Sequence, residues 1–447
     1  MVTYQDFLSS KTNEENVKSF IYKAINEYKT SSNYNWAVEG DKYARQLNTT
    51  IMKYQKLLYT MSGKAVPDNY TANHKLASNF FDRFVTQETQ YLLGNGVTFN
   101  DKDTKEKLGG SQFDYEIQKA GKNALIQGVS FVFFNFNHIE VFKADEFVPL
   151  WDEEDGALKA GIRFWQISTD KPLRATLYEL DGKTEYIKRK DQKLEVLQEK
   201  TPYIQIVKTS VADGVEIYNG ENYPNFPIIP LWGNSYHQSE LVGIKSEIDA
   251  YDLIRSGFAN DVDDASLIYW TLENCGGMDD IDMAKFIERM KTVHAASIDG
   301  DGNARAEAHT IDLPTNAREV ALDRLEKDLY NDFMALNLSK LTSGGIAVTA
   351  TAIVAAYEPL NQKADSFEYE VNKCIKGILD LIGVDDEPTF KRNQIANESE
   401  QTAMIISCAD YLDTETILKH LPFLNVDEVE SIIKRKKKEQ NSSNNEE

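Results

Sequence analysis

The sequence predicts an α+β fold, mainly α, on three observations. Apolar residues recur at spacings of three and four in long stretches on both sides of the middle of the chain, which indicates amphipathic helices. Between these stretches, from about 124 to 232, β-branched and aromatic runs alternate with short turns, as in an antiparallel meander. The chain has 447 residues, too many for one compact core, so we expect two to four domains or layers.

The N-terminal part is predicted to be helical. Residues 13–62 contain few helix breakers, and residues 72–93 form a clearer amphipathic helix. In the second stretch Leu76, Phe80 and Phe84 lie four residues apart, which places them on one face. The sequence GNG that follows is expected to end this helix.

Two landmarks define the predicted meander. Asp181 and Gly182 separate two strand-like runs and are a strong hairpin signal. Residues 222–234, NYPNFPIIPLWGN, contain prolines that exclude a helix and close the meander.

A long helix is predicted over 239–265, with Ser239 able to cap its start. Its remaining faces are mainly acidic, with only Lys245 and Arg255 as bases. An apolar stripe on such a helix needs a neighbour, whereas the acidic faces need water. The stripe consists of Leu241, Ile244, Ile248, Tyr251, Ile254 and Phe258.

The rest of the chain continues this pattern. Residues 266–313 are predicted to be a small α/β insert with a strand, a helix and a glycine-tipped hairpin. Thr315 begins a second long helix, and a third runs from Thr349 to Ile382 with a kink expected at Pro359. Residues 397–438 read as short helices, and the polar charged end that follows is expected to be disordered.

Composition limits the function. The formal net charge of −22 is spread along the chain, which argues against tight binding of nucleic acid. Three cysteines, far apart and without a CxxC pair, make a thiolate zinc site unlikely and fit a reducing compartment. The N-terminus shows no secretory signal, and the most apolar run, 345–357, is too short to span a bilayer. We therefore expect a protein made in a cytosol, without a membrane partner.

No candidate catalytic or metal site is complete. The loop at 341–345 lacks the Lys-Ser/Thr pair of a phosphate-binding loop. His138 and Glu140 share a strand face but have no third ligand nearby, and residues 299–303 resemble only half of a calcium loop. We therefore predict no cofactor and no metal. The carboxylates of Asp279, Asp280 and Asp282 are better explained as the acidic start of a helix.

Three segments resemble one known family, the portal proteins of tailed bacteriophages, the head-to-tail connector portals of siphophage type in particular. Residues 73–99 are similar to the family's N-terminal helix and the turn after it. Residues 226–265 are similar to its proline-rich strand and stem helix, with Ile248–Ser256 as the core of the motif. The sequence LTSGGIAVTA at 341–350, before a kinked helix, is similar to the tunnel loop. The resemblance extends from about residue 70 to 385.

The resemblance implies a division of the chain into the parts of a portal subunit. An N-terminal wing with helices and an antiparallel meander would be followed by a helical stem, a small α/β clip, a tunnel loop and a helical crown. The bounds are 1–238 for the wing, 239–265 and 314–337 for the stem helices, 266–313 for the clip, 338–349 for the tunnel loop, 350–385 for a kinked wing helix, 386–438 for the crown and 439–447 for the tail.

The resemblance also implies a function without catalysis. Twelve subunits would form a ring at one capsid vertex, nucleate procapsid assembly with the major capsid and scaffolding proteins, and pass double-stranded DNA in both directions. The terminase large subunit and later a head-completion or adaptor protein would dock on the ring.

Three groups of residues follow from this assignment. They are the tunnel-loop residues Lys340, Thr342, Ser343, Gly344 and Gly345, the acidic channel-wall candidates Glu247, Asp249, Asp252, Asp323 and Glu326, and the docking candidates Asp279, Asp280, Asp282, Lys285, Glu288 and Arg289.

Two other functions stay open at this point. Another particle component, a head–tail adaptor or minor capsid protein, would lack two long helices bracketing a small domain. An enzyme that binds nucleotide at 341–345 would need the missing lysine.

Overall fold

The protein is described by a computed structural model. The structure describes residues 2–59, 62–69, 71–190, 192–209, 216–265, 269–273, 280–292, 305–309, 315–337, 350–393, 402, 405–409, 411–421, 429 and 432–435. The predicted tunnel loop, most of the predicted crown and the C-terminal tail therefore lie outside the described residues.

The chain divides into two compact units. The first contains Met1–Tyr34, Val85–Gln238 and Met334–Glu447, and the second contains Asn35–Phe84 and Ser239–Phe333. Each unit is thus built from segments that are distant in sequence. The predicted mixture of helices and antiparallel strands, with helices predominating, is confirmed.

The first unit contains a five-stranded antiparallel sheet in the order β10-β9-β8-β7-β6. Two N-terminal helices pack on it, and Phe7, Ile21 and Ile25 lie buried in their shared core with residues of β6, β7 and β8. The β8–β9 turn lies at Asp181 and Gly182, as the sequence predicts. These elements are α1 (Tyr4–Ser10), α2 (Glu14–Lys29), β6 (Phe147–Trp151), β7 (Leu158–Trp165), β8 (Leu173–Glu179), β9 (Gly182–Lys188) and β10 (Leu194–Thr201).

The first unit also contains a three-stranded sheet in the order β13-β4-β5. Helices α7 and α12 pack against it. Pro230 lies in β13 at the edge of the sheet, where a residue without an N–H is tolerated. The elements are α7 (Ser111–Gln127), β4 (Val129–Asn135), β5 (His138–Lys143), η1 (Ala144–Glu146), β13 (Ile228–Trp232) and α12 (Ala350–Ile382).

Smaller elements surround these two sheets. The hairpin β11–β12 is a separate two-stranded sheet, so the predicted single meander is divided into several sheets, and the short pair β16–β3 lies outside it in sequence. The elements are β3 (Val97–Thr98), α6 (Lys102–Lys107), β11 (Ile204–Thr209), β12 (Glu216–Glu221), β16 (Thr389–Phe390) and α14 (Thr414–His420).

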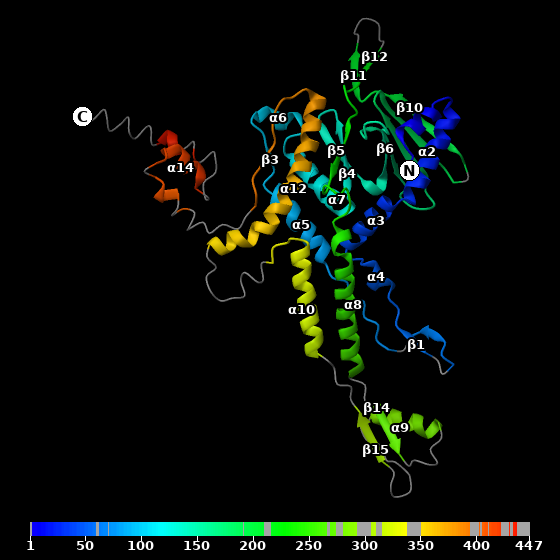
Figure 1. The fold of residues 1–447 in the computed structure, drawn as a ribbon. Coiled ribbons are helices and arrows are strands. Elements are labelled where there is room, and N and C mark those ends of the chain that lie inside the picture. The colour runs from blue at the N-terminus through cyan, green and yellow to red at the C-terminus, as the bar shows by residue number, and fades with distance from the viewer. Residues whose placement is uncertain are drawn as a thin grey trace, which may run out of the picture. The chain divides into compact units, whose positions relative to one another are not determined.

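The second unit is built around two long helices, α8 and α10, with a small hairpin and an α/β insert (Figure 1). In the insert, β14 pairs with β15 in antiparallel register. Helix α5 begins in this unit and ends in the first. The elements are α3 (Ser32–Ala44), α4 (Thr49–Lys53), β1 (Leu57–Tyr59), β2 (Ala65–Pro67), α5 (Phe80–Leu93), α8 (Leu241–Ala265), β14 (Tyr269–Glu273), α9 (Asp280–Thr292), β15 (Arg305–His309) and α10 (Thr315–Asp332).

The helix predicted over 13–62 is wrong as a single element. Helix α3 ends at Ala44 because Gln46 adopts a left-handed backbone conformation with φ of 59°. The N–H of Leu47 then donates to the carbonyl of Lys42 at 2.8 Å, the bond that closes such helix ends. The chain continues into the short helix α4 and the hairpin β1–β2.

Helix α12 confirms the third long helix, with Pro359 inside it. Proline lacks the N–H for an intrahelical bond, and Figure 1 shows α12 changing direction along its length.

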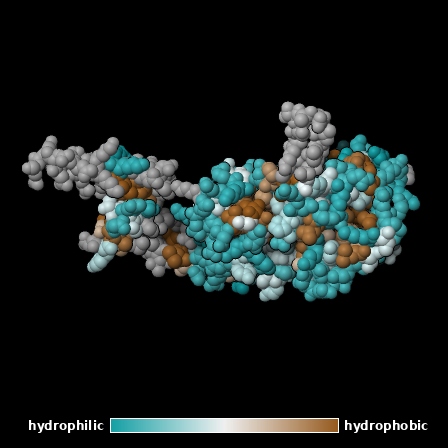
Figure 2. All heavy atoms as spheres, turned by 90° about the horizontal axis from the view of Figure 1, so that it is seen from above, coloured by the Kyte–Doolittle hydropathy of each residue, from teal (hydrophilic) through white to brown (hydrophobic). Residues whose placement is uncertain are grey.

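On the face seen in Figure 2 hydrophilic side chains predominate, and hydrophobic ones form separate patches. In the part of the chain that the structure describes, no helix is long and apolar enough to cross a membrane.

Candidate functional site

The site that the sequence points to is the pair of long helices α8 and α10. They run antiparallel, because Asp261 near the end of α8 forms an ion pair with Arg318 near the start of α10. At the other end, an aromatic cluster joins them to α5. Phe84 stacks on Phe333 with ring centroids 4.9 Å apart and meets Tyr330 edge-on at 5.0 Å. The pair is therefore held together by burial at one end and by charge at the other.

The predicted apolar stripe of α8 is buried only in part. Leu241, Ile244 and Ile248 are fully buried. Further along, Ile254 and Phe258 are only partly covered within the subunit. The helix is thus packed tightly at its start and presents apolar surface towards its end.

An extended segment runs along α8 and is held by its polar side chains. The backbone N–H groups of His74, Leu76 and Ser78 donate to Asn260 Oδ1 at 2.6 Å, Ser256 Oγ at 3.0 Å and Asp252 Oδ1 at 2.8 Å. Alternate residues of the segment thus meet every fourth residue of the helix. This replaces the helix predicted from residue 72, and α5 begins only at Phe80.

Asp252 lies at the centre of this arrangement with 0% of its surface exposed. Its second carboxylate oxygen accepts a hydrogen bond from Asn48 Nδ2 at 2.5 Å, so it joins two separate stretches of chain to α8. Burial raises the pKa of Asp252 above its usual value, although the hydrogen bonds from Asn48 and Ser78 act in the opposite direction. The prediction that Asp252 faces a channel is wrong, because a side chain buried within its own subunit lines no surface.

Asp249 is also engaged within the subunit. Its carboxylate accepts hydrogen bonds from the hydroxyls of Tyr43 and, at 2.8 Å, Thr50, and it pairs with Lys245 at 2.6 Å. Lys245 in turn lies over the Tyr43 ring, 5.0 Å from its centroid. These contacts hold the end of α3 and the start of α4 against α8.

Glu247 lies on the side of α8 that faces α10. Its Oε2 atom is buried and has no hydrogen-bond partner in the part of the chain that the structure describes. The pKa of Glu247 is raised to about 7, first because burial disfavours the charged form. The carboxylate of Asp332 on α10 raises it further, since it accepts a hydrogen bond from the protonated form and repels a second negative charge, and the charge of Asp328 adds to this repulsion.

The two acidic candidates on α10 are more accessible. Asp323 is exposed and Glu326 is partly exposed. Asp323 shares a face of the helix with Glu319 and Val320, which lie four and three residues before it and are also exposed. We refer to these three residues as the outer face of α10.

Charged side chains cover the helix of the insert. Asp282, Lys285, Glu288 and Arg289 of α9 are all exposed, whereas Phe286 is buried. Lys285 Nζ lies 3.5 Å from Asp282 Oδ1. Asp280 is the first residue of α9, and Asp279 lies outside the described residues. The tunnel-loop candidates Lys340, Thr342, Ser343, Gly344 and Gly345 also lie outside them.

With this geometry in place, the comparison with known families is decisive. The family described as phage portal protein, SPP1 Gp6-like, matches residues 25–445, almost the whole chain. The chain belongs to the phage portal protein family. As a portal protein it is a component of the phage virion.

Two curated relatives are similar over most of their length. The portal protein of Clostridium phage phiCD119 is 24% identical over 405 residues, which cover 83% of this chain and 86% of the relative. The portal protein of Bacillus phage SPP1 is 25% identical over 457 aligned positions, which cover 94% of this chain and 86% of the relative.

Solved structures of gene transfer agent particles are also similar. The neck of the native particle, computed with C12 symmetry, gives a TM-score of 0.46 at 12% identity and covers 78% of this chain and 91% of that chain. The virion of the native particle gives 0.45 at 12% identity, over 78% of this chain and 90% of that chain.

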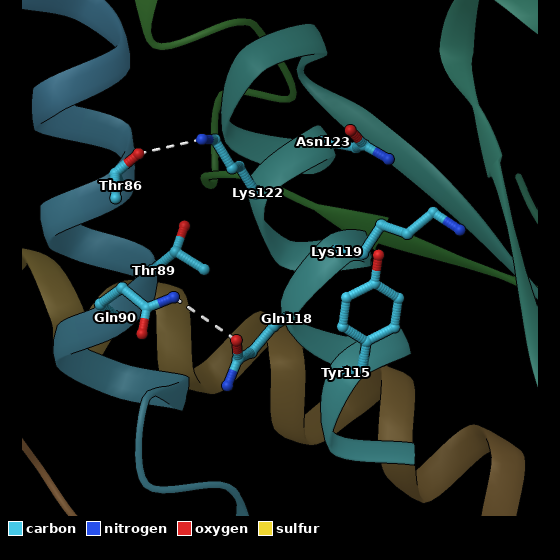
Figure 3. A pocket seen from close by; sticks show the side chains of 8 residues that line it. All are labelled: Thr86, Thr89, Gln90, Tyr115, Gln118, Lys119, Lys122 and Asn123. Carbon is cyan, nitrogen blue, oxygen red and sulfur yellow. Dashed lines mark hydrogen bonds between the residues drawn. The ribbon is translucent and has the colours of Figure 1, made fainter. Parts of the chain in front are cut away.

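The first unit of this portal protein contains a small pocket between α5 and α7 (Figure 3). Its volume is about 250 Å³. Lys122 Nζ donates to Thr86 Oγ1 at 2.9 Å across it, and Gln90 meets Gln118 at 3.4 Å. Among its lining residues there is no carboxylate, histidine or cysteine. Across the described residues, no group of three or more potential ligands could hold a metal ion.

The weak motif at His138 and Glu140 forms part of the fold. His138 Nε2 lies 3.7 Å from Glu140 Oε1, and the same oxygen accepts a hydrogen bond from Asn135 at 2.7 Å. Arg163 approaches Glu140 Oε2 at 3.9 Å. The carboxylate is therefore occupied by neighbours on β4, β5 and β7.

Sequence reasoning missed the polar row of α8 as a structural feature. Asp249, Asp252, Ser256, Asn260 and Asp263 follow one another at spacings of three and four, which places them on one face. Asn, Ser and Asp side chains mixed on one helix face favour hydrogen bonding to the backbone of a neighbouring segment. They are less typical of a channel wall exposed to water. Asp263 fits the row, since its Oδ2 lies 2.5 Å from His74 Nε2.

Proposed function

We propose that this portal protein assembles into a closed ring of twelve subunits at a single capsid vertex. The observation that carries the proposal is the antiparallel pair α8 and α10, which brackets a small α/β insert in a chain of the portal family. The partly covered apolar residues at the end of α8 gain a partner when subunits associate. The ring would nucleate procapsid assembly with the major capsid and scaffolding proteins in the host cytoplasm.

Double-stranded DNA would pass through the ring without sequence-specific binding. An acidic wall repels the phosphate backbone, so the duplex slides and is not retained. Glu326 remains a candidate for this wall, and Asp323 is a candidate for either the wall or a subunit interface. Thr342, Ser343, Gly344 and Gly345 would form an uncharged constriction after Lys340.

The insert would be the docking site for other proteins. Helix α9 presents acidic and basic side chains together, which suits a polar interface that forms and dissociates. The terminase large subunit would bind there during packaging, and a head-completion or adaptor protein would follow. Reversal of charge at Lys285 and Arg289 should weaken terminase binding without affecting ring formation.

The protein itself would catalyse no reaction and need no cofactor, because the motor supplies the hydrolysis of ATP. The alternative functions are another head–tail connector or minor capsid protein, and an enzyme that binds nucleotide at 341–345. The family match favours the portal over the connector. The missing Lys-Ser/Thr pair counts against the enzyme.

Negative-stain electron microscopy of the purified protein tests the proposal. End-on class averages should show rings with a central hole and twelve-fold symmetry. Particles that remain monomeric with scaffolding protein present would contradict it. A nucleotide titration of the same preparation should show no binding, whereas stoichiometric binding would favour the enzyme.

A further inference from the structure

A small hairpin of the second unit buries neither of its faces. We call residues 53–67 the arm, of which 53–59 and 62–67 are described. Strand β1 pairs with β2 through three residues on each side. Leu57, Leu58 and Tyr59 are all exposed, Tyr59 to 74%. In Figure 1 the hairpin extends away from α4 and α8, which belong to the same unit.

The contacts within the arm are too few to stabilise its hairpin structure. A two-stranded hairpin of this size is marginally stable in water. Its two ends, however, are fixed to α8, since Asn48 before it and Ser78 after it both donate to Asp252. An apolar hairpin that is anchored at both ends and exposed on both faces indicates a contact with another molecule.

The charge of the arm differs from that of the rest of the chain. It contains Lys53, Lys56 and Lys64 and no acidic residue, a formal charge of +3. Since the whole chain carries −22, the remainder carries −25. A second copy of this chain therefore offers an acidic surface to the arm.

The outer face of α10 has the matching chemistry. Val320 is 68% exposed, a large value for an apolar residue in a helix, and Glu319 and Asp323 flank it. On the outer face of α10 an aliphatic side chain lies between two carboxylates, and on the arm leucines lie between lysines. The apolar side chains of the two surfaces can therefore pack together while their opposite charges attract. The exposed leucines and tyrosine of the arm favour a protein partner over the DNA duplex, which its lysines alone would also attract.

We propose that the arm of one subunit packs on the outer face of α10 of the next copy in the ring. A head-to-tail contact needs two different and complementary patches on the same subunit, and the arm and this face are such a pair. The inference rests on the proposed ring and places Asp323 at the subunit interface.

Charge reversal and rescue test this contact. The double variant Lys53→Glu, Lys64→Glu should reduce the ring fraction seen by native mass spectrometry about tenfold or more. Adding Glu319→Lys and Asp323→Lys should restore rings. The control Lys23→Glu, Lys190→Glu changes the same charge at exposed positions of the first unit and should leave rings unchanged. The variant Leu57→Ser, Tyr59→Ser should also lose rings while retaining the circular dichroism of the wild type.

The outcomes separate the inference from the proposed function. A wild-type protein that forms no ring contradicts both. Wild-type rings that persist in the arm variants overturn the inference and leave the ring intact. Rings that are lost by arm charge reversal and not restored by the α10 changes also overturn it, because the partner face is then not α10.

Discussion

Asp252 of α8 accepts a hydrogen bond from the backbone N–H of Ser78 at 2.8 Å, in a position that has no contact with solvent. Ser78 is the last of three alternate residues that donate to α8. Two residues of extended chain advance about 6.6 Å, and four residues of helix advance about 6.0 Å, so the two repeats stay in step. The side chains of the helix thus serve as the hydrogen-bonding edge that a neighbouring strand would supply.

Removal of this acceptor should destabilise the second unit. Asp252→Ala leaves the buried N–H of Ser78 without a partner and releases Asn48, which should lower the free energy of unfolding by about 2–4 kcal/mol. Asp252→Asn keeps one acceptor oxygen and should lose less. Urea unfolding followed by circular dichroism measures both. The control Asp323→Ala alters an exposed acid and should change the free energy by less than about 0.5 kcal/mol. If Asp252→Ala changes the free energy of unfolding as little as Asp323→Ala does, Asp252 has no structural role.

Glu247 makes the stability of the helix pair depend on pH. Its folded-state pKa of about 7 lies above its ordinary value of 4.5, so the folded protein binds this proton more tightly than the unfolded chain. The stabilisation is complete below pH 4.5 and is lost as the pH rises through 7. Glu247→Gln keeps the neutral form at all pH values. Its melting temperature should match the wild type near pH 4.5 and exceed it by about 1–4 °C at pH 8.

The control for this experiment is Ser246→Ala, an exposed neighbour that does not titrate. Its difference in melting temperature from the wild type should be independent of pH. A Glu247→Gln difference that is equally independent of pH would mean that Glu247 has the same pKa in the folded and unfolded protein.

The periodicity of the sequence predicts the long helices and most of the strands. Apolar spacing alone identifies α8, α10 and α12, and the Asp181–Gly182 turn predicts one hairpin in register. Ser239 was expected at the start of α8, and its hydroxyl accepts from the N–H of Leu241 at 3.2 Å. These features depend on local chemistry, which a single sequence contains.

Prediction from local sequence patterns fails where a distant segment supplies the hydrogen-bond partners. Leu76 and Phe80 have helical spacing, yet the chain around Leu76 is extended because α8 accepts its N–H groups. The same contacts bury Asp252, which the sequence alone predicts to lie on a solvent-exposed face of the helix. Neither outcome follows from composition or spacing within one segment, since both depend on which segments the fold brings together.

Gly161 of β7 should tolerate no side chain. A Cβ atom there would lie 2.0 Å from Cζ of Phe147, a fully buried ring that also packs on Phe131 at 4.4 Å. Gly161→Ala should therefore destabilise the first unit by about 1–3 kcal/mol, measured by thermal unfolding. Gly156→Ala, in the preceding turn, meets open space and should cost only the strain of its positive φ, about 1 kcal/mol. A larger loss at Gly156 than at Gly161 would contradict this packing.

Glu326 tests the channel directly, because it is a partly exposed acid of α10 that lies outside the proposed subunit contact. Glu326→Lys adds one cation per subunit, and in the proposed ring of twelve subunits these cations would attract the phosphate backbone together. DNA packaging in a defined assay should slow, and raising the salt concentration should restore much of the rate because it screens the new attraction. Glu199→Lys makes the same change at an exposed position of β10 and should leave packaging unchanged. Unchanged packaging by Glu326→Lys at low salt, with rings intact by electron microscopy, would place Glu326 away from the DNA.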